Sequence, residues 1–276
     1  FFPAGFYYKT FMWPPSFWYK IYEPFIRMAA GFGEASIKHD KERYEHKYEY
    51  CDLLITGSGP SGLASAYAAA KNGARVILAE DKPRFGGSLL TSDVNVGNQT
   101  GVEWTEKIIA ELKSMPNVTV KNRSQVFGYY DHNMLVMSER ISDHLPKTQK
   151  YLPKQRLWYI RANEVLISSG SIERPLVFGN NDTPGVMLSS AAKEYMKVYG
   201  VLVGKKPLIF TNNDSGYETA IEFKKNGVNP IILDTRSNPS SDIITEAKNL
   251  NIEIKFSYVV VAAKGYKKVK SADIAK

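Results

Sequence analysis

Short apolar runs alternate with a glycine-rich turn and an alanine-rich stretch near residue 60. Two runs of strand length occupy residues 51–56 and 75–80. Between them, Gly57–Gly62 reads as a turn and residues 63–71 favour a helix that Gly73 would end. A strand, a glycine turn, a helix and a second strand within about thirty residues predict a βαβ unit.

The pattern changes to shorter alternations in the middle of the chain. A helix is predicted at 103–115 and a strand at 118–120. An antiparallel meander is indicated by stretches in which apolar and polar positions alternate, namely 126–130, 134–137 and 156–160. The run 164–169 before Gly170 returns to the pattern of a buried strand followed by glycine.

A second strand–helix alternation begins near Lys206. It predicts strands at 207–211, 230–234 and 252–256, and helices at 215–225 and 243–250. The fold class expected is therefore α/β: a Rossmann-type dinucleotide-binding domain with an antiparallel β-meander insertion and a second, partial Rossmann-like domain. We expect an arm and linker at 1–47, the dinucleotide-binding domain with its meander at 48–200, and the second, incomplete half at 201–276.

The first 33 residues are dense in aromatic side chains. Four prolines and four charged residues interrupt this stretch, so it predicts neither a membrane span nor a signal peptide. So much aromatic surface needs a dry partner, which indicates an irregular arm packed on its own domain or on another subunit. Residues 34–47 are polar and charged and read as a linker.

The turn at Gly57–Gly62 fits the pattern G-x-G-x-x-G, and its context makes the match specific. It follows a predicted strand and opens a predicted helix, and Glu80 ends the next strand eighteen residues after Gly62. Gly57 permits the tight turn, Gly59 lets a pyrophosphate approach the backbone, and Gly62 lets the helix pack against the strand. Glu80 can accept hydrogen bonds from both ribose hydroxyls and would repel a 2′-phosphate, which favours NAD or FAD over NADP.

Two further segments fit a dinucleotide site, although each could be an ordinary loop. In flavoproteins resembling glutathione reductase, a Gly-Gly pair such as Gly86-Gly87 follows the ribose-binding acid. Ser168-Ser169-Gly170 matches a strand end that passes close to the cofactor in those proteins. The predicted cofactor-binding residues are Gly57, Ser58, Gly59, Pro60, Ser61, Gly62, Glu80, Asp81, Gly86, Gly87, Ser88 and Gly170.

The second half shows a weaker loop, Thr211–Gly216, in which only Gly216 is glycine. Without the first two glycines a pyrophosphate cannot approach closely, so we predict that this half binds no second dinucleotide in the usual way. Asn213, Asp214 and Ser215 would cap the following helix instead.

No nucleophile–base constellation is visible, and the catalytic residues are not identified by the sequence. The pairs Asp131-His132 and Asp143-His144 read as loop residues, because adjacent strand residues point to opposite faces. The four histidines have no metal-ligand spacing, and we propose no metal site. The single cysteine, Cys51, excludes an internal disulfide and a Cys-x-x-Cys pair, which fits a reducing, cytoplasmic compartment.

The formal charge of +8 is spread along the chain, which is typical of a solvated surface and argues against a nucleic-acid partner. Several longer strings are more specific than the glycine motif. Over nearly its whole length the sequence resembles the alpha subunits of heterotetrameric sarcosine oxidases, in its aromatic opening (3–14) and at 131–133, 156–158, 170–178, 180–188 and 211–215.

This resemblance implies an enzyme that oxidatively demethylates sarcosine, giving glycine, hydrogen peroxide and a one-carbon unit that can pass to tetrahydrofolate. It implies that NAD lies on the glycine-rich loop and Glu80 of this chain. It also implies partner subunits of beta, gamma and delta type, with FMN at the alpha–beta interface and with FAD and the main substrate pocket in the beta subunit. The loop after Gly170 and residues 180–187 would be neighbours of the cofactors.

Two departures limit what the resemblance carries over. Alpha subunits of that family are several times longer and have a folate-binding part that this sequence lacks, so folate chemistry is not assigned. The chain begins at Phe1 and ends in lysine-rich sequence just after a predicted strand at 258–263, so we expect a fragment.

The motif residues alone would equally suit FAD, so other functions stay open. One alternative is a stand-alone FAD-dependent oxidoreductase of the glutathione-reductase-like superfamily. Others are a related amine, proline or opine dehydrogenase subunit, or an assembly scaffold that keeps a dinucleotide as structural glue.

Overall fold

The computed structural model describes residue 11 and residues 13–33, 36–146 and 151–276. The chain divides into two compact units, Phe1–Glu42 and Arg43–Lys276. In the first unit, the π-helix η1 (Trp18–Tyr22) continues into α2 (Glu23–Ala29). The irregular arm expected from the prolines is therefore helical over these residues. Pro24 lies in the first turn of α2, where no backbone N–H is needed for an intrahelical bond.

Aromatic side chains in the described part of the first unit are largely exposed. Trp13, Tyr19 and Phe32 have exposed fractions of 80%, 80% and 84%. The ring centroids of Phe11 and Tyr22 lie 5.2 Å apart. The predicted aromatic positions among residues 1–10 lie outside the described residues.

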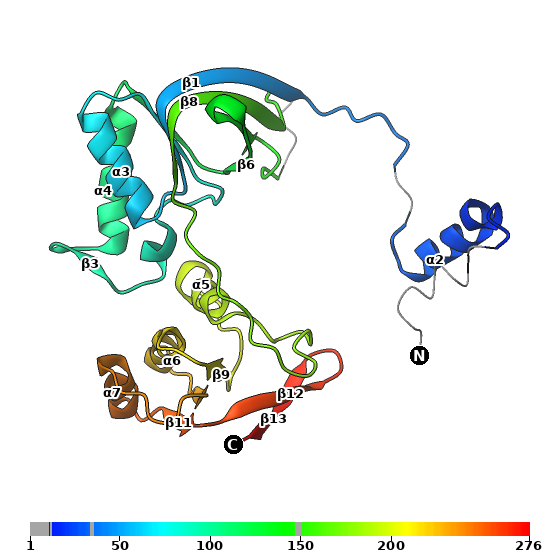
Figure 1. Cartoon of the computed structure of the whole chain (residues 1–276), viewed down its shortest axis with the longest axis vertical. Helices are drawn as coiled ribbons and strands as arrows, with labels where there is room; N and C mark the ends of the chain where they lie inside the picture. Colours follow the sequence, from blue (N-terminus) through cyan, green and yellow to red (C-terminus); the bar gives the residue numbers. More distant parts are fainter. Residues whose placement is uncertain (1–10, 12, 34–35, 147–150) are drawn as a thin grey trace. The chain divides into compact units, whose positions relative to one another are not determined.

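A six-stranded mixed sheet forms the first half of the second unit (Figure 1). Its order is β5-β2-β1-β8-β7-β6; neighbouring strands from β5 to β8 are parallel, and β7 and β6 continue the sheet antiparallel. The strands are β1 (Tyr44–Thr56), β2 (Val76–Ala79), β5 (Val118–Lys121), β6 (Ser124–Tyr130), β7 (Met134–Arg140) and β8 (Gln155–Ile167).

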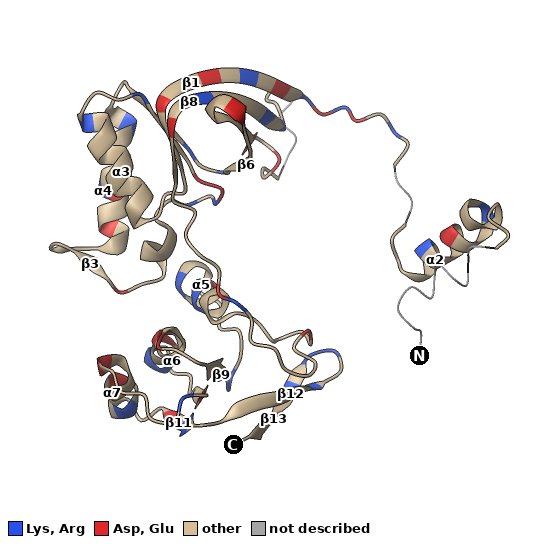
Figure 2. Ribbon diagram, in the orientation of Figure 1, with Lys and Arg blue, Asp and Glu red and all other residues tan. Residues whose placement is uncertain are grey.

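The strands β1 and β8 are longer than expected and pair in register from Tyr44↔Gln155 to Thr56↔Ile167. β1 therefore begins inside the stretch expected as a linker. One strand, β8, covers both the last meander stretch and the run before Gly170, which the sequence pattern had separated. The early part of β1 carries no apolar run, because charged residues alternate there with tyrosine and histidine (Figure 2).

Two helices, α3 (Pro60–Lys71) and α4 (Gly101–Ser114), pack on the parallel part of this sheet. Leu63 and Ala66 of α3 and Leu112 of α4 are fully buried against strand residues such as Leu78. Both helices begin earlier than expected, by three residues for α3 and two for α4. Between them lie η2 (Gly87–Leu90) and the short pair β3 (Asn95–Val96) and β4 (Gln99–Thr100), while η3 (Asp131–Asn133) joins β6 to β7.

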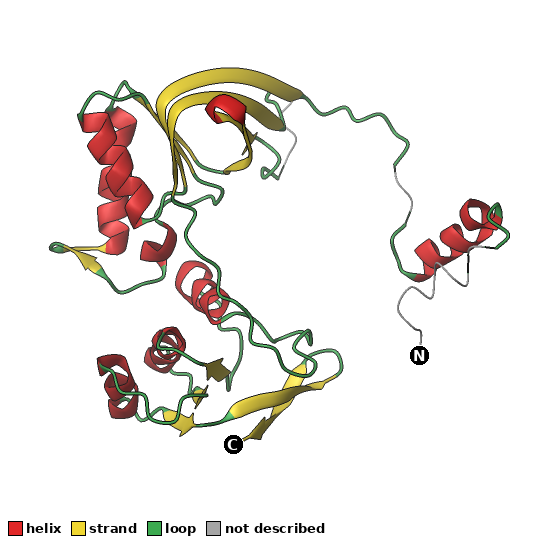
Figure 3. Cartoon of the chain, in the orientation of Figure 1, coloured by secondary structure: helices red, strands yellow, loops and turns green. Residues whose placement is uncertain are grey.

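The second half has the expected strand–helix alternation (Figure 3). Its parallel sheet has the order β11-β10-β9, from β9 (Leu208–Thr211), β10 (Ile231–Asp234) and β11 (Glu253–Phe256), with helices α6 (Ser215–Lys225) and α7 (Asp242–Asn249). Tyr217, Phe223 and Ile232 are the centre of its core. Two elements were not predicted: α5 (Ser189–Tyr199) and β13 (Val269–Ala275), which forms a hairpin with β12 (Val259–Gly265).

In the part of the chain that the structure describes, no helix is long and apolar enough to cross a membrane.

Candidate functional site

The glycine-rich loop joins the end of β1 to the start of α3, and two of its glycines are enforced by close backbone contacts. Gly57 has a φ of +100°, and a Cβ added there would lie 2.3 Å from the carbonyl oxygen of Ser168. A Cβ on Gly62 would lie 2.0 Å from the carbonyl oxygen of Gly57. Any side chain at either position would therefore force the turn, the end of β8 and the helix apart.

Gly59 differs from the other two glycines of the motif. It is the N-cap of α3, with an extended backbone, and a Cβ built on it would meet no atom within 4 Å. The first turn of a helix presents N–H groups without intrahelical partners and the positive end of the helix dipole. The space beside Gly59 therefore lies where an anionic group such as a pyrophosphate can be bound.

The Gly86–Gly87 segment lies directly against this loop. Both residues have positive φ, +120° and +52°, and a Cβ on Gly87 would lie 2.9 Å from the Cα of Gly59. The backbone N–H of Gly86 donates to the carbonyl oxygen of Ser58 at 3.1 Å. The structure thus brings together the two glycine segments that the sequence analysis singled out.

Glu80 follows β2 and points its carboxylate into the glycine loop. Its Oε2 accepts the backbone N–H of Ser58 at 2.9 Å and the Ser58 hydroxyl at 2.5 Å. Its Oε1 accepts the backbone N–H of Lys82 at 3.0 Å. Burial, followed by a hydrogen bond with Asp81, raises the pKa of Glu80, while the bonds from Ser58 and Lys82 favour the carboxylate.

The remaining predicted site residues lie around this centre rather than in it. Pro60 and Ser61 are exposed at the start of α3, and Asp81 and Ser88 are exposed in the segment after β2. Gly170 has a φ of +72° and no atom within 4 Å of an added Cβ. At the end of β8 it is the backbone of Ser168 and Ser169, rather than Gly170, that contacts the loop.

Lys82 is a site residue that the sequence analysis missed, because its contribution comes from its backbone. Its N–H donates to Glu80, and its ammonium group pairs with Glu194 of α5 at 2.8 Å. The next turn of α5 carries Lys197, which pairs with Asp93 at 2.7 Å. Two ion pairs therefore connect α5 with the segments that flank the candidate site.

The equivalent place in the second half is filled by its own side chains. Arg236 donates to Asp214 in the loop at 2.8 Å and to the buried Asp234 at the end of β10, also at 2.8 Å. The Tyr217 hydroxyl donates to the same Asp234 carboxylate at 2.7 Å. Asn213 accepts from the backbone N–H of Ser215 at 2.9 Å, whereas the N-cap residue of α6, Asp214, makes no side-chain capping bond and binds Arg236 instead.

The two acid–histidine pairs lie in turns, and in one of them Nδ1 of His144 lies 3.6 Å from Oδ1 of Asp143. His132 lies in the η3 turn with a φ of 57°, and its backbone carbonyl accepts from Arg161. Asp143 is held by Arg140 and Gln155, at 2.9 and 3.0 Å. Among the described residues, no group of three or more His, Cys, Asp and Glu side chains could hold a metal ion.

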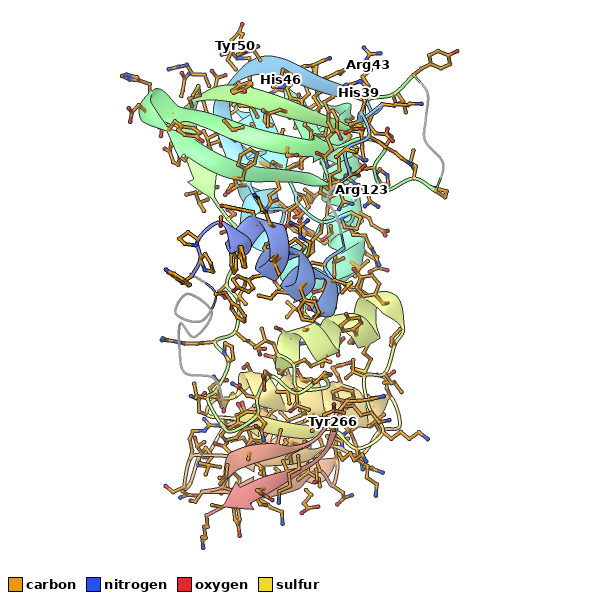
Figure 4. The ribbon with its side chains drawn as sticks, turned by 90° about the vertical axis from the view of Figure 1, so that its right-hand side faces the viewer. His39, Arg43, His46, Tyr50, Arg123 and Tyr266 are labelled. Carbon is orange, nitrogen blue, oxygen red and sulfur yellow. The ribbon has the colours of Figure 1, made fainter. Side chains whose placement is uncertain are left out.

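Another histidine, His46 on β1, is exposed on the outer part of the sheet (Figure 4). Its ring stacks on Tyr159 of β8 with 6.0 Å between centroids, and Tyr159 in turn stacks on Tyr48 at 5.1 Å. These side chains form cross-strand aromatic pairs that stabilise the β1–β8 ladder.

Comparisons with known proteins show which sequences and structures this chain is similar to. Residues 52–140, which include the end of β1, the glycine loop and Glu80, match the family model of FAD dependent oxidoreductases. The chain is 43% identical over 272 residues to the alpha subunit of the sarcosine oxidase of Rhizobium meliloti (strain 1021), covering 98% of this chain and 27% of the relative. It is 34% identical to the corresponding protein of Corynebacterium sp. (strain P-1), covering 84% of this chain and 24% of the relative. The resemblance to sarcosine oxidase alpha subunits is confirmed.

The chain spans about a quarter of the length of these curated relatives. A more distant relative is one subunit of the opine oxidase of Agrobacterium tumefaciens (strain Ach5), which is 26% identical over 59% of this chain and 33% of that protein. The sequence similarity to sarcosine oxidase alpha subunits therefore covers nearly all of this chain but only about a quarter of the length of each alpha subunit.

Solved structures show the same fold at low sequence identity. The thioredoxin reductase of T. acidophilum has a TM-score of 0.60 and 17% identity, covering 82% of this chain and 70% of that chain. The L-proline dehydrogenase of P. horikoshii has a TM-score of 0.57 and 20% identity, covering 87% of this chain and 41% of that chain. The predicted α/β fold with Rossmann-type halves is confirmed. The match of residues 52–140 to FAD dependent oxidoreductases supports a flavin or dinucleotide cofactor.

Proposed function

We propose that this chain holds an adenine dinucleotide, NAD, in a sarcosine oxidase-type alpha subunit. The observation that carries the proposal is the open space beside Gly59 at the N-terminus of α3, with Glu80 facing the same loop. The pyrophosphate would lie against the α3 N-terminus, and the adenosine ribose would donate to Glu80. The negative carboxylate disfavours a 2′-phosphate, which supports NAD over NADP.

The proposed reaction is the oxidative demethylation of sarcosine, an oxidation at a CH–NH bond, carried out by a complex. Flavin groups supply the hydride-accepting chemistry in such a reaction. Within this chain, the residues described above bind and orient the dinucleotide. We propose partner subunits of beta, gamma and delta type and an FMN group at a subunit interface, in a heterotetramer in the cytoplasm. The names of the relatives, which are subunits, support a multisubunit enzyme.

A second candidate is FAD in this chain, as in a stand-alone oxidoreductase. The match of residues 52–140 to FAD dependent oxidoreductases supports it. The loop suits both ligands, because NAD and FAD share the ADP half that the loop recognises. A disulfide-reductase activity is disfavoured, since the one cysteine, Cys51, is buried and burial raises the pKa of its thiol to about 11.

A substrate assay of the isolated complex tests the proposed reaction. The chain would be purified with any subunits that accompany it, and hydrogen peroxide release would be measured with sarcosine, proline and an opine as separate substrates. The proposal expects peroxide from sarcosine and little from the other two. Peroxide release from proline or the opine in place of sarcosine would assign the chain to an oxidase of that substrate instead.

A further inference from the structure

Ser58, between the first two glycines of the loop, is fully buried and hydrogen-bonded on both sides. Its backbone N–H and its hydroxyl both donate to Oε2 of Glu80, at 2.9 and 2.5 Å. The hydroxyl oxygen also accepts the backbone N–H of Gly86 at 3.2 Å. One small side chain therefore joins the glycine loop, the acid after β2 and the Gly86–Gly87 segment.

These bonds fix which part of the Glu80 carboxylate is free to bind a ligand. A carboxylate offers about four acceptor positions, two on each oxygen. Ser58 fills both positions on Oε2, and the Lys82 N–H fills one on Oε1. Apart from the Asp81 side chain, which also hydrogen-bonds to this carboxyl group, the acceptor position that remains is on Oε1. The two donors on Oε2 hold the side chain in the orientation that presents it.

We propose that Ser58 is a positioning residue, which orients Glu80 for one hydroxyl of the adenosine ribose and ties Gly86 to the phosphate-binding loop. This inference rests on the proposed dinucleotide site and deepens it. Ser58 is buried beneath the loop and acts through Glu80. Its replacement will therefore weaken recognition of the ribose more than recognition of the diphosphate.

The test compares ADP with 2′-deoxy-ADP and 3′-deoxy-ADP. The chain, with any subunits that accompany it and with bound dinucleotide removed, would be titrated with each by calorimetry. We expect wild type to bind one of the two deoxy compounds about tenfold more weakly than ADP, because that compound lacks one hydrogen bond to a charged acceptor. In S58A this ratio should fall to about twofold, while binding of that deoxy compound changes little.

Four further variants distinguish positioning from general damage. S142A removes the hydroxyl of another buried serine, which lies outside the glycine loop and donates to the Pro153 carbonyl at 2.9 Å. This variant should keep the wild-type ratio. E80Q should lose the discrimination, and S58A/E80Q should lose no more than E80Q, because Ser58 acts through Glu80. If S58A does not fold, S58C fills the site with a larger side chain that is only a weak donor, and should give an intermediate ratio.

The outcomes separate the inference from the function on which it rests. If wild type binds ADP and discriminates, but S58A and S58C keep the full ratio, the role of Ser58 is overturned while the dinucleotide site stands. If wild type binds none of the three nucleotides, the site itself fails, and the inference fails with it.

Discussion

The three glycines of the loop, Gly57, Gly59 and Gly62, have different surroundings, so each position has its own reason for carrying glycine. Gly57 and Gly62 leave no room for a side chain, because backbone oxygens lie 2.3 and 2.0 Å from an added Cβ. At Gly59 nothing in the chain occupies that space. Gly57 and Gly62 are needed for the fold, and we propose that Gly59 is needed for binding the dinucleotide.

This difference predicts the behaviour of G59A and G62A. Gly59 has a φ of −65°, which alanine adopts without strain, so G59A should melt close to wild type in the absence of dinucleotide. Its methyl group would occupy the approach to the pyrophosphate and should lower dinucleotide affinity by about tenfold or more. G62A should lose both stability and binding. Thermal melting and calorimetric titration measure the two effects, and wild-type affinity in G59A would contradict the assigned ligand position.

The raised pKa of Glu80 leads us to expect that the stability of the chain depends on pH. Its pKa is raised in the folded chain, chiefly by burial. Between the unfolded value of about 4.3 and the raised folded value, the folded chain holds a proton that the unfolded chain has released. The free energy of unfolding of the dinucleotide-free chain should therefore fall as pH rises through this window.

The measurement compares wild type with E80Q by denaturant unfolding between about pH 4 and 8. The difference between the two removes the contribution of all other groups. The wild-type stability should fall relative to E80Q as pH rises. A flat difference, or one of the opposite sign, would show that the Glu80 carboxyl is not destabilised by burial.

At the scale of elements, the strands and helices around the glycine loop were predicted because each has a strong local signal. The βαβ unit has two apolar runs and a glycine turn, and apart from the start of β1 its boundaries differ by only a few residues. β1 was predicted too short, because tyrosine and histidine alternate with charged residues over 44–50 and both sets read as polar. α5, which buries Ala192 and Met196, was not predicted.

The capping box of α4 predicts a local loss of stability on substitution. Thr100 accepts the backbone N–H of Glu103 at 3.2 Å, and Glu103 accepts the backbone N–H of Thr100 at 2.9 Å. T100A should lower the free energy of unfolding by about 1 kcal/mol. T245A, at an exposed position inside α7, should leave stability unchanged or raise it slightly, since alanine favours helix. Equal effects of the two substitutions would show that the capping box contributes nothing.

Replacing Arg236, which binds both Asp214 and Asp234, should lower the free energy of unfolding by more than T100A does. In R236M, the fully buried Asp234 keeps the Tyr217 hydroxyl but loses its cation. We expect a loss of about 1–3 kcal/mol, since Arg236 itself is partly exposed. The double variant R236M/D234N should recover part of this loss, because no charge remains buried. A loss in the double variant as large as in R236M would mean that packing, and not the buried charge, sets the effect.

At the scale of the whole molecule, the candidate site is assembled from segments that lie far apart in the sequence. The sequence motif predicted the loop, Glu80 and the glycine pair. It could not predict that the Ser168 carbonyl closes the space beside Gly57 or that the Lys82 N–H binds Glu80. Those contacts are set by the β1–β8 pairing and by backbone groups, which every residue type carries. The chain also spans only about a quarter of the length of its curated relatives.

The identity of the dinucleotide released from the purified chain tests the central claim most directly. The chain would be denatured, and the released compounds identified by mass spectrometry, for wild type and G59A in parallel. The proposed function predicts NAD without flavin from wild type and much less NAD from G59A. FAD released from the wild-type chain would contradict the NAD assignment, and an equal yield of dinucleotide from G59A would contradict the site.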